Sequence, residues 1–196
     1  MRKLFMLSAG ALLLAATLTG NAAAEELRGR LALTGKIGII NPAQGELDTP
    51  QGTMVVSTDA GLTGGLGLLF GVDDNVAVEL EVSRASFHTS HFGTAEVTDV
   101  SVGAQYRFPE RQRLVPYLGA GMDVLVNDLS SRYTNTTVGA HLSAGVDCIM
   151  NRQLSLTLEA KGVESFSADV DTPSGQRGEF DPTNLSVTVG ARIFFN

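Results

Sequence analysis

The sequence predicts an all-β protein, an eight-stranded antiparallel up-and-down transmembrane β-barrel, from three observations. Apolar and polar residues alternate with a period of two in eight segments, and helical periodicity is hard to find after residue 25. The connections alternate between short turns and longer polar loops. An export signal precedes the first segment. Together these features indicate a barrel in the bacterial cell outer membrane.

The expected signal peptide occupies residues 1–24. Arg2 and Lys3 precede an apolar segment at 4–18, and three alanines follow that end at Ala24. This order is typical of a secretory signal with an A-x-A cleavage site. The apolar segment is shorter than the roughly 20 residues of a membrane-spanning helix. Residues 25–196 are therefore expected to form the outer-membrane barrel.

The composition excludes several classes of protein. Without Arg2 and Lys3 the mature chain has 12 basic and 21 acidic residues, a net charge of −9. It has no basic stripe, so we expect no nucleic-acid partner. Cys148 is the only cysteine, which rules out an internal disulfide. Membrane insertion would require a closed barrel with every strand paired, because no later segment has the apolar length of a spanning helix.

Four segments of the first half show the alternation: 30–40, 61–72, 76–88 and 98–108. Their apolar residues are Leu31, Leu33, Ile37 and Ile39, then Leu62, Leu66, Leu68 and Phe70, then Val76, Val78, Leu80 and Val82, then Val100, Val102, Ala104, Tyr106 and Phe108. Side chains of a strand point alternately to its two faces. Each segment therefore has one apolar face and one polar face.

Four segments of the second half repeat the pattern: 116–127, 136–150, 154–161 and 184–195. Their apolar residues are Leu118, Ala120, Met122, Val124 and Val126, then Val138, Ala140, Leu142, Ala144, Val146 and Cys148, then Leu154, Leu156, Leu158 and Ala160, then Leu185, Val187, Val189, Ala191, Ile193 and Phe195. The total is eight amphipathic strands.

The connections between these segments differ in length. The short ones are 73–75, 109–113 and 151–153, and the longer polar ones are 41–58, 89–97, 128–135 and 165–183. This rhythm predicts a barrel with both termini and the short turns on the periplasmic side, and with the long loops outside the cell.

The composition of the polar face decides which face is inside. A soluble eight-stranded barrel is the alternative, with its apolar face inward. Its outer face should then be rich in Lys and Glu. The polar face is instead mostly Gly, Ser, Thr and Ala, which is typical of a cramped lumen. We therefore expect the apolar face to contact lipid.

Charged residues within the strands share the lumen face. The stretch VAVELEVSR at 76–84 places Glu79 and Glu81 there. The full expected network is Lys36, Glu79, Glu81, Asp99, Arg107, Asp123, His141, Asp147, Glu159, Lys161 and Arg192. Unpaired buried charges are strongly unfavourable, so these groups should pair across the lumen, with water satisfying the rest. The network is a structural plug or, alternatively, a gate that opens when pairs exchange partners.

Apolar residues are expected on the lumen face near the outer end of the barrel. They are Ile40, Ala85, Phe87, Val97, Leu125 and Val163. They predict an apolar vestibule above the charged plug that could hold a small hydrophobic molecule. The alternative is that these residues pack against loops folded into the barrel.

Four motifs carry a family resemblance: VPYLGAGMDV at 115–124, GVDDNVAVELEVS at 71–83, AGVDCIMNRQLSL at 144–156 and FDPTNLSVTVGARIFF at 180–195. Together they resemble the outer membrane protein W (OmpW) family of eight-stranded outer-membrane barrels. The resemblance implies a narrow, largely hydrophobic channel for small apolar molecules from outside. Several members have prolines in the upper part of the fourth strand that loosen the barrel wall, whereas this sequence has Asp99 and Val100 there. Whether a bound molecule could leave sideways through the wall into the membrane is therefore an open question. Phe195, one residue before the end, is expected to be read by the barrel assembly machinery.

Three functions follow from these observations. The leading one is binding or passive transport of small hydrophobic molecules, with outer-membrane lipid and lipopolysaccharide as surroundings and with no cofactor, metal or enzymatic activity. A second is a closed barrel whose loops contact ligands, phage or host, and loop 165–183 is the longest. A remote third is a lipid A acyl hydrolase, for which His88 and Ser90 form an H-x-S pair.

Overall fold

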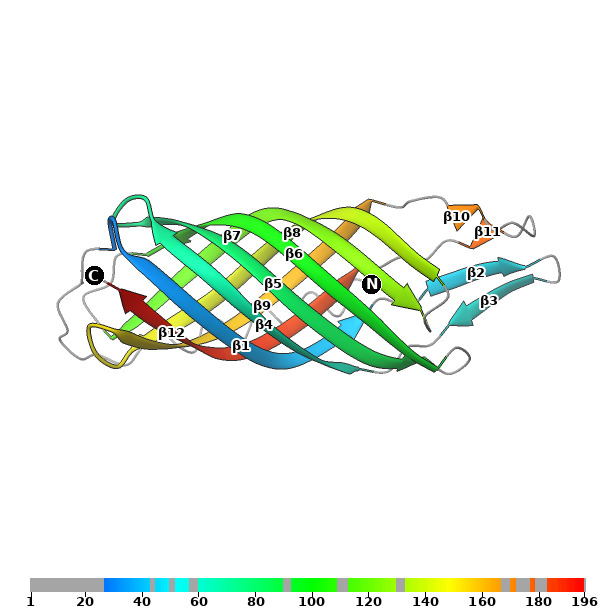
Figure 1. Ribbon diagram of the computed structural model, residues 1–196, viewed down its shortest axis with the longest axis horizontal. Coiled ribbons are helices and arrows are strands. Elements are labelled where there is room, and N and C mark those ends of the chain that lie inside the picture. Colours follow the sequence, from blue (N-terminus) through cyan, green and yellow to red (C-terminus); the bar gives the residue numbers. More distant parts are fainter. Residues whose placement is uncertain are drawn as a thin grey trace.

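Eight strands of the computed structural model close into one antiparallel barrel (Figure 1). The structure describes residues 27–42, 45–49, 52–56, 60–89, 93–108, 113–129, 133–166, 170–171, 177–178 and 183–195. In order around the barrel the strands are β1 (Leu31–Pro42), β12 (Asn184–Phe195), β9 (Leu154–Phe166), β8 (Tyr133–Ile149), β7 (Leu114–Leu129), β6 (Gly93–Arg107), β5 (Val76–Thr89) and β4 (Gly61–Gly71). The predicted fold class is confirmed.

Two small hairpins lie outside the barrel. The first consists of β2 (Gly45–Thr49) and β3 (Gly52–Val56), and the second of β10 (Val170–Asp171) and β11 (Arg177–Gly178). Both extend past the barrel end opposite the C-terminus, and β11 lies against β2 (Figure 1). No helix among the described residues is long and apolar enough to cross a membrane. The predicted signal peptide, 1–24, lies outside the described residues and stays a prediction.

Two of the predicted long loops are wrong. Residues 89–97 and 128–135 are mostly strand, because β5 and β6 pair up to Thr89 and Gly93, and β7 and β8 pair up to Leu129 and Tyr133. In these segments the positions that continue the lipid-facing row are polar (Thr94, Glu96, Asp128 and Thr134), so the apolar outer row that marks a strand inside the membrane is lost. The backbone ladder continues without it, since its hydrogen bonds do not depend on apolar side chains.

The two faces of the barrel differ as the sequence predicts. Large apolar side chains point outward around the whole circuit, and Leu62 and Leu142 are each 72% exposed. The interior holds Thr, Ser, Gln and charged side chains instead. A continuous apolar surface of this kind would be an aggregation hazard in water but suits lipid. The soluble-barrel alternative is therefore excluded.

The lipid-facing band has recognisable borders. On β7 the outward residues are apolar from Pro116 to Val126, which spans about 25 Å across the membrane at a strand tilt of about 40°. Near the periplasmic border, Tyr106 and Phe108 contact each other edge to face with ring centroids 5.2 Å apart. Above the band, on the outer face of β5 and β6, the side chains of Arg84 and Glu96 form an ion pair.

The periplasmic end of the barrel is closed by apolar side chains. The chain turns at Gly29, whose φ of 76° suits glycine, and Gly29 N–H donates to the Gly71 carbonyl at 2.8 Å. This turn brings Leu27 into the barrel base. We call the residues buried there the basal cluster: Leu27, Ala32, Leu69, Ala77 and Phe194.

The outward orientation can be tested with arginine substitutions on β5. Leu80 lies in the middle of the lipid-facing band, so Leu80→Arg should lower the free energy of unfolding by about 2–4 kcal/mol. Ser86 points outward on the same strand above the band, so Ser86→Arg should cost at most about 1 kcal/mol. Urea unfolding in lipid vesicles measures both. Equal, small losses would mean that Leu80 faces water.

Candidate functional site

The charged residues predicted for the lumen all lie inside the barrel. Ten of them are buried, and Glu81 is half-buried. They form three groups along the barrel. From the periplasmic end these are the lower group (Arg107, Asp147 and Arg192), the middle group (Lys36, Glu79, Glu81 and Glu159) and the upper group (Asp99, Asp123, His141 and Lys161).

The lower group is built around Asp147. Its Oδ2 accepts from Arg107 Nη2 at 2.5 Å and from Arg192 Nη1 at 2.7 Å. Both guanidinium groups lie over the ring of Tyr117, at 5.6 and 5.1 Å from its centroid. Arg192 Nε also donates to Thr34 Oγ1 at 3.2 Å. These contacts brace five barrel strands from inside, β1, β6, β7, β8 and β12, directly above the basal cluster.

The middle group places three carboxylates around one ammonium. Lys36 Nζ lies 2.5 Å from Glu81 Oε2, 2.8 Å from Glu159 Oε1 and 3.7 Å from Glu79 Oε1. Tyr117 Oη donates to the other oxygen of Glu159 at 2.8 Å. Arg192 Nη2 reaches Glu79 at 3.3 Å and connects this group to the lower one. The Gln105 amide also donates to Glu79.

The upper group combines a lysine with two aspartates and a histidine. Lys161 Nζ lies 2.9 Å from Asp99 Oδ2 and 2.8 Å from Asp123 Oδ1, and it donates to Ser101 Oγ at 3.2 Å. His141 Nδ1 lies 2.6 Å from Asp123 Oδ2. A lysine held by two carboxylates is kept charged and cannot serve as a base for Ser101. The geometry therefore favours a structural ion-pair cluster over a nucleophilic site.

Glycines on neighbouring strands make room for the large interior side chains. Lys36 is paired in register with Gly190, where an added Cβ would lie 3.0 Å from Lys36 Cγ. An added Cβ at Gly121 would lie 2.6 Å from His141 Cε1, and one at Gly145 would lie 2.4 Å from the Tyr117 ring. The glycines of the polar face thus determine where bulky groups fit.

The residues predicted for the apolar vestibule also face the interior. Ile40, Val97, Leu125 and Val163 are buried, and the last three contact one another. Phe87 lies on β5, but its side chain is outside the described part of the structure. The four buried residues and, below them, Glu81, Asp99 and Lys161 line one cavity of about 30 Å³. Such a volume holds only one or two waters, so a larger guest requires the apolar side chains to move.

Tyr117 and Gln105 are site residues that were not singled out from the sequence. Both are buried, and they hydrogen-bond Glu159 and Glu79 respectively. The sequence offered one signal, their parity, which is the alternation that places both residues on the lumen face. Tyr117 is a bulky residue among the glycines of β7, and Gln105 lies two residues before Arg107. Parity alone does not reveal which side chains meet across the lumen.

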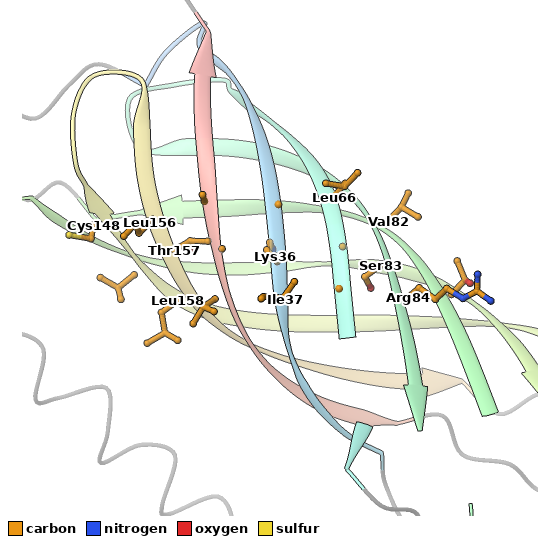
Figure 2. A pocket seen from close by; sticks show the side chains of 18 residues that line it. Lys36, Ile37, Leu66, Val82, Ser83, Arg84, Cys148, Leu156, Thr157 and Leu158 are labelled. Carbon is orange, nitrogen blue, oxygen red and sulfur yellow. The ribbon is translucent and has the colours of Figure 1, made fainter. Parts of the chain in front are cut away.

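A separate hollow lies along the outer wall of the barrel (Figure 2). Its lining includes the outward side chains of Ile37, Leu66, Val82, Leu156 and Leu158, which Figure 2 shows on the outside of the strands. Gly35 and Gly64 expose backbone between them. These residues belong to the lipid-facing band, so we assign the hollow to lipid contact.

A closed eight-stranded barrel with an apolar outer band and a charged lumen defines a bacterial outer-membrane β-barrel. The chain belongs to the family described as outer membrane protein beta-barrel domain, and the family model matches residues 10–192. The protein is thus located in the outer membrane. A comparison with curated proteins gives no significant match.

Solved outer-membrane barrels resemble the structure at low sequence identity. OprG from Pseudomonas aeruginosa has a TM-score of 0.70 at 14% identity, over 89% of this chain and all of that one. AlkL in lipid bilayers has a TM-score of 0.61 at 17% identity, over 91% and 96%. Outer Membrane Protein W from E. coli has 0.54 at 18% identity, over 87% and 100%. At these identities the likeness shows the fold alone.

The importance of the lower group can be tested by removing its carboxylate. Asp147→Asn leaves Arg107 and Arg192 without their shared buried anion, so the free energy of unfolding should fall by about 3–5 kcal/mol. The control is Glu96→Gln, which breaks the outer ion pair with Arg84 and should cost at most about 1 kcal/mol. Urea unfolding in lipid vesicles compares the two. An Asp147→Asn loss as small as the control would contradict a bracing role.

Proposed function

We propose that the barrel binds and passively transports small hydrophobic molecules that enter its lumen from outside the cell. The observation that supports this proposal is the apolar lining of Ile40, Val97, Leu125 and Val163 above the charged groups. Burial in such a lining is favourable by about 25 cal/mol per Å² of apolar surface. We also propose that the chain is a member of the OmpW family, in line with its four sequence motifs.

The charged groups below the apolar lining limit how far into the lumen a guest could move. Lys36, Lys161 and their carboxylates pair across the lumen, and the basal cluster fills the periplasmic end. An apolar molecule that moved between the ion pairs would remove their polar partners, which is costly. The guest site therefore lies at or above Val97, Leu125 and Val163, and further passage requires the interior to rearrange.

The surroundings of the barrel follow from its location. We propose lipopolysaccharide as the lipid at the outer border, near Arg84, and recognition by the barrel assembly machinery through Phe195. Phe195 is half exposed on the outer face, where it pairs in register with Leu31 of β1. A terminal aromatic that faces outward at the barrel seam is accessible to an assembly partner.

A closed barrel that acts through its loops is the second candidate. The small interior cavities of about 20 and 30 Å³ and the hairpins β2–β3 and β10–β11 beyond the barrel end favour it. The acidic residues of loop 165–183 and the H-x-S pair of His88 and Ser90 lie outside the described side chains. The lipid A acyl hydrolase reading therefore stays an untested alternative, and we expect no enzymatic activity.

The binding proposal can be tested at Leu125. Leu125→Asn puts an amide into the apolar lining, so affinity for a fluorescent apolar probe such as N-phenyl-1-naphthylamine should fall about tenfold. Val126→Asn is the control, since Val126 points outward at the top of the lipid-facing band. Probe fluorescence is titrated in liposomes with folded protein. Binding no better than to empty liposomes, or equal binding by both variants, would contradict the proposal.

The loop candidate makes a different prediction. Replacing residues 165–183 with a short turn leaves the interior contacts of β9 and β12 in place. Probe binding should therefore persist within about twofold, whereas adsorption of phage or host cells by a loop-acting barrel would be lost. Probe binding and adsorption assays on the same preparation separate the two functions. Loss of probe binding together with an intact fold would place the guest site in the loops.

A further inference from the structure

The charges of the lumen do not balance in the part of the barrel that the structure describes. Six carboxylates face four Lys and Arg side chains. The acids are Glu79, Glu81, Asp99, Asp123, Asp147 and Glu159, and the bases are Lys36, Arg107, Lys161 and Arg192. Even a protonated His141 leaves one negative charge over. A net charge in a desolvated interior is unfavourable, so a further positive charge would stabilise the lumen.

The missing positive charge belongs to the middle group. In the lower group two arginines share Asp147, so that group has no deficit. In the upper group Lys161 and His141 contact the two aspartates. The middle group has three glutamates around Lys36, with further help from Arg192 only at Glu79. Among these carboxylates Glu81 has Lys36 as its ion-pair partner and is the least buried.

A small cavity lies beside these glutamates, at the level between the middle and upper groups. Its volume is about 20 Å³, which is room for about one water molecule or one ion. Oxygen-bearing side chains in its lining are Glu79, Glu81, Ser101, Gln105, Ser143 and Glu159. Gly103 and Gly119 also line the cavity, and their lack of side chains keeps it open.

Gln105 gives an independent indication of a ligand in this cavity. Its side chain is 3% exposed, and its Nε2 donates to Glu79 Oε2. The amide cannot be turned over, because its oxygen would then face the carboxylate. Gln105 Oε1 accepts no hydrogen bond from the described residues. A buried acceptor without a partner is costly, and a cation in the cavity that Gln105 lines would satisfy it.

The chemistry of the lining selects the kind of cation. Carboxylate, amide and hydroxyl oxygens are ligands for hard metal ions. No group of three or more His, Cys, Asp or Glu among the described residues is arranged to hold a metal. Lys161 and His141 also line the cavity, and the lysine ammonium opposes a doubly charged ion more strongly than a singly charged one. We propose that the cavity binds a single monovalent metal cation, Na⁺ or K⁺, through Glu81 and Gln105. The ion neutralises the middle group and stabilises the closed lumen.

The test compares salts at constant ionic strength. Protein in detergent micelles is unfolded thermally in NaCl, in KCl and in N-methyl-D-glucamine chloride, whose organic cation is too large for the cavity. A bound ion should raise Tm by roughly 3–6 °C when present at about ten times its Kd, and the rise should saturate. Glu81→Gln should abolish the rise. Asp73→Asn, on an exposed periplasmic turn, removes the same charge elsewhere and should keep it.

A second measurement on the unaltered protein keeps the test decisive if Glu81→Gln does not fold. The ²³Na NMR line of bound sodium should broaden with protein and should sharpen when K⁺ competes. Equal Tm values in the three salts and no displaceable broadening would overturn the proposal, because a proton or a water would then occupy the site. A Na⁺ or K⁺ effect that survives in Glu81→Gln would also overturn it, since the ion would bind elsewhere.

Discussion

The pairing of β1 with both β4 and β12 is the constraint on which the rest of the structure depends. It closes the sheet, so each barrel strand pairs on both sides along its membrane-spanning part and no strand edge faces lipid. Closure by only eight strands makes the lumen narrow. Any charged side chain on the inner face must therefore meet others, and Arg192, which has no exposed surface, contacts Asp147 and Glu79 from strands far apart in the sequence.

The interior changes in character along the barrel, and this order shapes the function. The apolar basal cluster closes the periplasmic end, ion pairs fill the middle, and Val97, Leu125 and Val163 form an apolar layer toward the outside. A hydrophobic guest fits the last of these environments only. Among the described residues, the ion pairs link seven of the eight barrel strands across the lumen, all except β4, and so add to the backbone pairing of the wall. Rigidity below and an apolar lining above are compatible with a binding barrel.

Much of the fold could be predicted because a strand has a period of two. The faces of all eight barrel strands, including the positions of Glu79 and Glu81 in VAVELEVSR, follow from alternation alone. The upper ends of β5 to β8 could not, since the positions that continue the lipid-facing row, such as Glu96 and Asp128, are polar once the strands leave the membrane. The alternation reports the surroundings of each face, so the signal of a membrane strand ends where the outer face meets water.

The sequence by itself determined which side chains enter the lumen, because parity assigns every residue to one face. Only the tertiary structure decided which of them touch. Lys36 reaches Glu159 across 123 residues, and Lys161 reaches Asp99 across 62, because strand tilt and stagger set the height of each residue in the barrel. Those heights also leave the small cavity beside Gln105. They depend on closure of the whole sheet, which no single strand encodes.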